Sequence, residues 1–164
     1  MVTQIRESIF TDDDKDYQLW IQFTIARYIT FRTREKELQR YSLSPENALV
    51  LEVINSLGDA ATPAEIARVI LLEPHSVSGL LNRMEIKGLI TKYRDLRRRN
   101  LVRLAMTEKG KVAFNYASKR GPIHRIMSAL DDNEREQFRV ILDKIILKAK
   151  HELGLDRDEY PSSD

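Results

Sequence analysis

Cysteine is absent from this 164-residue sequence. Disulfide bonds, zinc sites with cysteine ligands and thiol-based redox sensing are therefore excluded. Long hydrophobic runs are missing as well, because no apolar stretch approaches the roughly 18 residues that a membrane-spanning helix needs. The start of the sequence carries Asp12, Asp13 and Asp14 before any apolar periodicity, which is unlike a signal peptide. We therefore expect a cytoplasmic protein without a membrane partner.

Histidine is scarce, and the residue types that build catalytic or metal centres do not cluster. The three histidines, His75, His124 and His151, form no closely spaced pair of metal ligands. A zinc site completed by carboxylates is the alternative, but it would lack both thiols and paired imidazoles. No nucleophile–base pair, phosphate-binding loop or paired-carboxylate motif stands out from the surface charge. We expect no enzymatic activity, no cofactor and no metal.

The formal net charge of +2 hides an uneven distribution of charge. Between Arg83 and Arg103, eight basic residues oppose two acids, so this stretch carries a net charge of +6. Residues 131–164 contain ten acids and six bases, which gives a net charge of −4. A basic patch separated from an acidic C-terminal end is typical of a nucleic-acid-binding protein with a second, non-binding region.

A long helix is predicted over residues 12–40. Acids open its first turn, as the helix dipole favours, and neither glycine nor proline interrupts it. Leu19, Phe23, Ala26 and Thr30 lie along one stripe of this helix. The helix is too long for a small module alone to cover. We therefore expect part of its surface to pack against something else.

Three shorter helices follow, and each has a start signal. Ser44 is an N-cap with Pro45 at the first helical position, and Thr62 forms a capping box with Glu65. Pro74 opens the third helix, in which apolar residues recur at i, i+3, i+4 and i+7 and predict a buried stripe. The members of this stripe are Val77, Leu80, Leu81 and Met84.

A hairpin comes after these helices. Residues 89–93 and 101–106 read as paired strands around a loop at 94–100, and Thr107 caps the helix that follows. Two short helices, a hairpin and a further helix are the elements of a winged helix-turn-helix in their required order. The sequence therefore predicts a mainly α fold, a winged helix-turn-helix with long N- and C-terminal helices.

The C-terminal part of the sequence is predicted to be helical up to a polar tail. The helix after Thr107 runs to about Lys119, where a Gly-Pro pair kinks or breaks it, and helix continues over 123–130. Asp131 or Asp132 caps a last helix, which reaches about Leu153 and has a strong apolar face. Residues 155–164 read as a disordered tail.

The second helix of a helix-turn-helix lies in the major groove with its N-terminal residues at the base edges. Asn82 can pair there with adenine, and Arg83 with guanine or a phosphate. Gly79 lets the backbone approach the groove closely. The alternative is an ordinary amphipathic helix with a polar outer face. The candidate DNA-binding residues of this helix are His75, Ser76, Ser78, Gly79, Asn82 and Arg83.

Arginines crowd the predicted tip of the hairpin. Their guanidinium groups repel each other unless an anion is near, and arginine suits a narrow minor groove and phosphate contacts. We expect Asp95 to orient one of them through a salt bridge. The alternative is a solvated charged turn, which the adjacent helix pair makes less favourable. The candidate DNA-binding residues of the hairpin are Lys92, Arg94, Asp95, Arg97, Arg98 and Arg99.

Short motifs run through the whole pattern: LSPE at 43–46, SVS at 76–78, RMEIKGLI at 83–90, DLRR at 95–98 and LAMTEKG at 104–110. On these motifs and their order, the sequence resembles the MarR family of transcriptional regulators over residues 14–153. It departs from the commonest pattern in the wing, where three arginines run together, so the arginine that enters the minor groove is left open.

The resemblance implies a homodimer that binds a palindromic double-stranded DNA operator and acts as a ligand-responsive repressor. Residues 12–40 and 108–153 would form the dimerisation region and residues 43–107 the DNA-binding domain. The long flanking helices agree, because they carry more apolar surface than one small module covers. Two-fold symmetry then predicts DNA half-sites about one helical turn apart.

The resemblance also implies a site for a small aromatic or phenolic effector. Side chains of the first helix would supply aromatic walls and one cation. The alternative is that most of them belong to a dimer core or to the surface, as aromatic residues at helical spacing usually do. The candidate ligand-binding residues are Trp20, Phe23, Arg27, Tyr28 and Phe31.

Two other functions compete with DNA-dependent regulation. A winged helix also serves as a protein-interaction module without specific DNA binding, because a fold does not fix a function. Such a module would not need four arginines at the hairpin tip. RNA binding is less favoured still, since the basic surface lacks exposed aromatic residues for base stacking.

Overall fold

The computed structural model describes residues 14–96, 98 and 100–155. These residues form a mainly helical fold with one two-stranded antiparallel sheet, which confirms the predicted fold class. Most of the predicted tail at 155–164 lies outside the described residues. The chain divides between Ile123 and His124 into two compact units. The described part of the chain holds no helix with the length and apolar character that a membrane span requires.

The first helix, α2, spans Lys15–Leu38, slightly less than predicted. Its N-cap is Asp14, whose Oδ1 accepts hydrogen bonds from the backbone N–H groups of Asp16 and Tyr17, both at 3.0 Å. A 3-10 turn, η1 (Gln39–Tyr41), ends it. Leu38 is the one buried residue of α2. The predicted apolar stripe is therefore largely uncovered within this chain.

Helix α3 (Pro45–Leu57) begins as predicted. Ser44 Oγ accepts from Asn47 N at 3.2 Å, and Asn47 Oδ1 accepts from Ser44 N at 3.3 Å. The two residues form a capping box that satisfies backbone donors at the helix start. A 3-10 turn, η2 (Gly58–Ala60), follows α3.

Helix α4 (Pro63–Ile70) has half of the capping box that its sequence predicts. Thr62 Oγ1 accepts from Glu65 N at 3.1 Å, as expected. The Glu65 carboxylate does not complete the box with the Thr62 backbone. It instead accepts a hydrogen bond from Arg68 Nη1 at 2.7 Å, because an arginine one turn on offers a charged donor.

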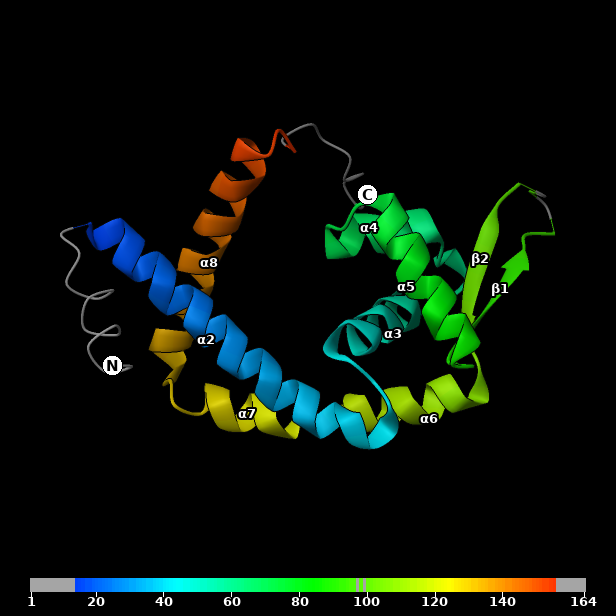
Figure 1. The fold of residues 1–164 in the computed structure, drawn as a ribbon, viewed down its shortest axis with the longest axis horizontal. Helices are drawn as coiled ribbons and strands as arrows, with labels where there is room; N and C mark the ends of the chain where they lie inside the picture. Colours follow the sequence, from blue (N-terminus) through cyan, green and yellow to red (C-terminus); the bar gives the residue numbers. More distant parts are fainter. Residues whose placement is uncertain (1–13, 97, 99, 156–164) are drawn as a thin grey trace, which may run out of the picture. The chain divides into compact units, whose positions relative to one another are not determined.

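Helix α5 spans Pro74–Ile86 and packs on α4 (Figure 1). Leu71 ends α4 in the left-handed conformation, with φ of +54°, and lets the chain turn between the two helices. The predicted stripe of α5 is buried, with each member at most 7% exposed. Its members are Val77, Leu80, Leu81 and Met84.

The wing consists of β1 (Ile90–Arg94) and β2 (Val102–Met106), paired antiparallel with Ile90 opposite Met106. Figure 1 shows the hairpin standing beside α5. Leu104 anchors its base, since the side chain is 1% exposed and the backbone N–H donates to Ala61 O at 3.0 Å. The predicted hairpin is therefore confirmed, with the first strand shifted by one residue and the second beginning one residue later than predicted.

Helix α6 spans Glu108–Ala117 and begins at the predicted N-cap, Thr107. Thr107 Oγ1 accepts from Gly110 N at 3.0 Å and donates to Gly88 O at 2.6 Å. Gly110 is required here, because an added Cβ would lie 1.9 Å from Leu89 O. The start of α6 is thus fixed tightly against the base of the wing.

The core of the first unit lies among α3, α4, α5, α6 and the base of the wing. Contacts at the end of α6 attach α2 to this core. Arg34 Nη2 donates to Ala117 O at 2.6 Å, and the rings of Tyr41 and Tyr116 stack with centroids 3.5 Å apart. The largest fully buried side chains are Leu38, Val50, Leu51, Ile66, Val77, Leu81, Met84, Ile90 and Leu104.

Helix α7 spans Gly121–Met127, whereas the sequence predicts a helix over 123–130. The predicted break is present, because α6 ends at Ala117, and the Gly-Pro pair then forms the first turn of the next helix. Pro122 occupies the second helical position, where the missing N–H has no partner to lose. The boundary between the two units falls within α7.

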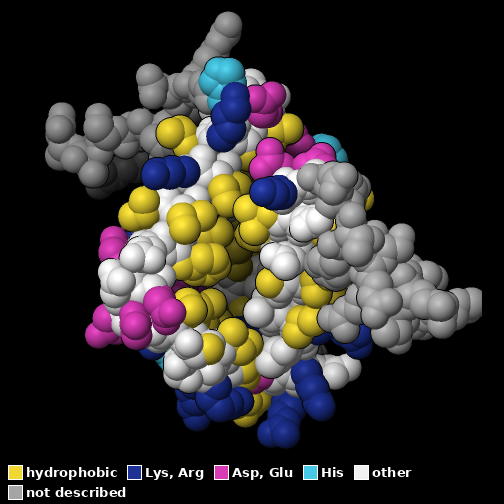
Figure 2. Space-filling model, turned by 90° about the vertical axis from the view of Figure 1, so that its left-hand side faces the viewer, with side chains coloured by type: hydrophobic (Ala, Val, Ile, Leu, Met, Phe, Trp, Pro, Cys, Tyr) yellow, Lys and Arg dark blue, Asp and Glu magenta, His cyan; other side chains and the backbone are white. Residues whose placement is uncertain are grey.

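Helix α8 (Asp132–Glu152) begins at a capping box between Asp131 and Glu134, with hydrogen bonds of 2.8 and 2.9 Å. The helix is described along its whole length, and none of its residues is buried. Most of its apolar side chains are exposed, and Leu142 is half-buried. Figure 2 shows hydrophobic side chains that reach the molecular surface. The apolar stripe consists of Phe138, Ile141, Leu142, Ile145 and Ile146.

Candidate nucleic-acid interface

The outer side of α5 carries polar side chains that the core does not use. His75, Ser76, Asn82 and Arg83 are exposed. Ser78 is exposed too, and its hydroxyl donates to Pro74 O at 2.9 Å, which leaves the oxygen free to accept a hydrogen bond. The sequence-predicted residues of this helix therefore share one accessible face opposite the buried stripe.

Gly79 lies on the same face, and no packing among the described residues requires a glycine there. A Cβ added there would meet only Arg83 Nη1, at 3.4 Å, which is ordinary contact with the end of a flexible side chain. A glycine inside a helix costs about 1 kcal/mol of stability relative to alanine. The residue thus weakens α5 without relieving any clash in the described chain.

Asn82 and Glu85 connect α5 to the wing through Lys92. Lys92 Nζ lies 3.1 Å from Glu85 Oε2 and also donates a hydrogen bond to Asn82 Oδ1. The backbone N–H of Lys92 donates to Glu85 Oε1 at 3.2 Å. The sequence gives Lys92 as a candidate phosphate contact, but here its ammonium group has partners within the chain. Glu85 was not among the predicted residues.

Asp95 fixes the loop of the wing. Its Oδ1 accepts from the backbone N–H of Arg98 at 2.9 Å, and its Oδ2 accepts from Arg103 Nε at 2.8 Å. Arg103 Nη1 also donates to Asp59 O at 2.8 Å, which ties the wing to η2. The predicted salt bridge from Asp95 to a tip arginine stays a prediction, because two of those arginines lie outside the described residues; the described partner of its carboxylate is Arg103. Arg103 is a diagonal cross-strand neighbour of Asp95, so a positioning residue was missed.

The tip of the wing carries exposed positive charge. Arg94 and Arg98 are exposed, and neither side chain has an acidic partner among the described residues. Arg97 and Arg99 lie outside the described residues. Leu96, at the same tip, is 98% exposed. Asp95 therefore holds the loop, while its neighbouring guanidinium groups face solvent.

A groove along α2 gathers three of the five predicted ligand-binding residues. It has a volume of about 510 Å³ and is lined by Arg27, Tyr28 and Phe31, with Arg32 and Glu35 from the same helix and Glu46 from α3. The Arg27 guanidinium lies 5.7 Å from the Phe31 ring centroid, and that of Arg32 lies at the same distance from the Tyr28 ring.

The other two predicted ligand-binding residues lie outside this groove. Trp20 and Phe23 contact each other, with ring centroids 6.4 Å apart, and both are exposed. Sequence reasoning missed the second cation, Arg32, and the two carboxylates of the groove. The helical spacing of Tyr28 and Arg32 is the signal that points to this pair.

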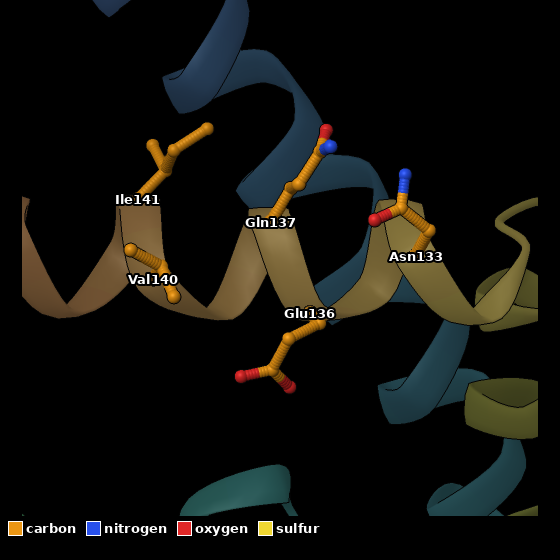
Figure 3. A pocket seen from close by; sticks show the side chains of 5 residues that line it. All are labelled: Asn133, Glu136, Gln137, Val140 and Ile141. Carbon is orange, nitrogen blue, oxygen red and sulfur yellow. The ribbon is translucent and has the colours of Figure 1, made fainter.

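A shallow apolar depression lies along α8 in the second unit. Asn133, Gln137 and Ile141 point to one side of the helix, as their spacing of four residues requires, and Glu136 points away (Figure 3). Only α8 lines this depression, so it belongs to the exposed face of a single helix. Elsewhere, the described residues contain no group of three or more metal-ligating side chains.

The arrangement of α4, α5, β1 and β2 defines a winged helix-turn-helix. A MarR-family model matches residues 41–99, which include α3, the helix-turn-helix and the first strand of the wing, β1. The chain also matches the structure of the organohalide-sensing transcriptional regulator RdhR-CbdbA1625 at 30% identity, and the match covers 94% of this chain and 93% of that one. The chain therefore belongs to the MarR family of transcriptional regulators.

Solved structures match the whole fold. The TM-score is 0.75 against the ligand-free form of RdhR-CbdbA1625 and 0.76 against its 2,4-dichlorophenol-bound form, which is also 30% identical with 94% of each chain covered. The S. aureus MepR–DNA complex has a TM-score of 0.74 at 20% identity, with 83% of this chain and 99% of that chain covered, and shows likeness of fold. A comparison with curated protein sequences gave no match.

Proposed function

We propose that this protein is a homodimeric, non-enzymatic repressor that binds a palindromic double-stranded DNA operator. The observation that carries the proposal is exposed arginine charge on a braced wing, beside the polar outer face of α5. Unpaired guanidinium groups suit phosphates and narrow minor grooves. The similar MepR fold was solved as a complex with DNA, which supports this use of the fold.

The wing and α5 would contact different parts of the DNA. Residues at the start of α5 would face base edges in the major groove, and Arg83 would reach a guanine or a phosphate. Arg94 and Arg98 would contact the backbone or the adjacent minor groove. Asp95 and Arg103 would position these arginines by fixing the loop. The proposed DNA-binding set is His75, Ser76, Ser78, Gly79, Asn82, Arg83, Lys92, Arg94, Asp95, Arg97, Arg98 and Arg99.

The exposed apolar faces of α2 and α8 support the homodimer. Large exposed apolar surfaces mark sites of protein association. Residues 12–40 and 108–153 would form the dimerisation region, and residues 43–107 the DNA-binding domain. A two-fold dimer would present two α5 helices to half-sites about one helical turn apart.

The groove on α2 supports an effector site for a small aromatic or phenolic anion. Arginine remains charged at any physiological pH, so Arg27 and Arg32 would favour a phenolate or carboxylate beside the rings of Tyr28 and Phe31. RdhR-CbdbA1625 is described as organohalide-sensing and was solved with 2,4-dichlorophenol. A bound effector would act by changing the spacing of the two α5 helices, because groove register tolerates little misfit.

Fluorescence anisotropy across a salt series tests the proposal. The purified protein is titrated into a duplex from the DNA just upstream of its own gene, with a scrambled duplex as the control. We expect tight, sequence-dependent binding and a steep dependence on salt, because phosphate contacts release counterions. Weak binding that is equal for the two duplexes, together with a random-sequence library from which the protein enriches no duplex, would instead favour a protein-interaction module.

A further inference from the structure

Glu85, Lys92 and Asn82 form a chain of contacts from the base of the wing to the outer face of α5. The Glu85 carboxylate makes two contacts with Lys92. Its Oε2 lies 3.1 Å from Nζ in an ion pair, and its Oε1 accepts a hydrogen bond from the backbone N–H at 3.2 Å. Lys92 is about three-quarters buried in consequence, with its side chain 24% exposed. Its ammonium group then reaches Asn82 Oδ1, which belongs to the DNA-facing set.

The chemistry of lysine fixes which way the Asn82 amide points. An ammonium group has three donors and no acceptor, so only the carbonyl oxygen of an amide can face it. The reverse orientation would place the Nδ2 hydrogens against a positive charge. Asn82 Nδ2 is therefore turned away from Lys92, and no acceptor within the described part of the chain takes its hydrogens.

This orientation changes which base edge Asn82 suits. Pairing with adenine requires the amide to accept from N6 and to donate to N7. Here the accepting oxygen already faces a cation, and an adenine amino group would bring a second donor to the same place. Guanine offers two acceptors, N7 and O6, and no donor on this edge. A side chain that presents only donors matches guanine.

We propose that Lys92, clamped by Glu85, orients Asn82 so that this position of α5 selects guanine over adenine. This inference rests on the proposed binding of DNA through α5, and it replaces the adenine pairing expected from the sequence alone. Lys92 is a positioning residue in this scheme. Its effect is on base choice, which a simple phosphate contact would not alter.

Selection of duplexes from a random-sequence library tests the inference with the full-length protein. The wild type, Asn82→Ala and Lys92→Met are selected in parallel. The half-site position whose base preference disappears in Asn82→Ala is the one that Asn82 reads. We expect guanine there for the wild type, and a shift of the guanine-to-adenine ratio by about tenfold towards adenine in Lys92→Met, within the discrimination that one good base contact gives.

Two control variants separate base choice from loss of charge. Arg94→Met removes a cation from the same strand without touching Asn82, so overall affinity should fall while the ranking of bases is unchanged. Lys92→Arg keeps a group that only donates, so guanine should remain preferred. Circular dichroism of each variant checks that the fold is intact.

The outcomes distinguish this inference from the proposed function. A wild type that enriches no sequence at all overturns both. A wild type that enriches a motif, but with adenine at the Asn82-dependent position or with no such position, overturns the inference and leaves DNA binding standing. The same holds if Lys92→Met selects guanine as strongly as the wild type does.

Discussion

The winged lobe, which consists of α3 to α6 with the wing, buries its apolar residues, whereas helix α8 exposes most of its own. In the lobe, Leu51 and Leu81 are at most 1% exposed and lie in a core shared by helices and the wing. In α8, Phe138 is 40% exposed and Ile141 is 52% exposed, although they lie on a regular apolar stripe. Both segments have the periodicity of an amphipathic helix. Periodicity therefore identifies a face to be covered without identifying what covers it.

This difference in burial shows which contacts a single chain can specify by itself. The lobe uses caps, a required glycine and cross-strand pairs that all lie within one chain, so it specifies its own packing. The stripe of α8 has no comparable partner among the described residues of its own unit. The proposed dimer supplies that partner, and variants in the two regions should therefore fail in different ways.

The largest effect is expected from a cavity in the lobe. Leu51→Ala should lower the free energy of unfolding by about 2–5 kcal/mol, because the lost methyl groups leave space that a packed core does not refill. Urea denaturation at one fixed protein concentration measures it. Leu49→Ala is the matched control on the same helix, since Leu49 is 50% exposed. Similar losses in the two variants would contradict the described core.

A charge on the stripe of α8 should act on association instead. Ile141→Glu should raise the dimer dissociation constant by about a hundredfold, because an apolar contact is lost and a carboxylate loses water at the interface. Sedimentation equilibrium measures this constant. Lys144→Glu places the same group on the polar side of α8 and should leave the mass of the dimer unchanged. A wild-type protein that is monomeric at micromolar concentration would contradict the proposed homodimer.

Sequence patterns predicted the lobe well, because its signals are local. Ser44, Thr62 and Thr107 cap the helices that they were expected to cap, and the α5 stripe is buried. Proline at a boundary was harder to interpret: the break after α6 was predicted, but Pro122 lies within the first turn of α7 and not before the helix. A break and a first turn share the same residue types.

Pairings between distant residues were not predictable in the same way. Asp95 with Arg103 and Lys92 with Asn82 depend on how the hairpin stands against α5, which no short motif records. Sequence patterns predicted the residue types of the candidate interface, whereas the contacts of Glu85 and Arg103 with it are seen only in the tertiary structure. Most residues of the candidate DNA-binding face were therefore predictable from the sequence, whereas the hydrogen bonds and ion pairs that fix them were not.

Within the lobe, a change at Arg98 should affect DNA binding without affecting the shape of the wing loop. Arg98→Ala should weaken DNA binding by about tenfold and lower the slope of log affinity against log salt by about 0.9, because one phosphate contact is lost. The loop should keep its shape, since Asp95 accepts from the backbone of Arg98 rather than from its side chain. Arg139→Ala, an exposed change on α8, is the control. An unchanged affinity with an unchanged slope would remove Arg98 from the site.

The smallest effect is expected at Gly79, where stability and binding should move in opposite directions. Gly79→Ala should stabilise the protein by up to about 1 kcal/mol, since alanine favours a helix interior and the added Cβ meets only the flexible end of Arg83. The same methyl group would stand between α5 and the groove, so DNA affinity should fall. Urea denaturation and anisotropy on the same preparation measure both changes. A variant that gains stability and keeps its affinity would show that α5 does not approach the groove at Gly79.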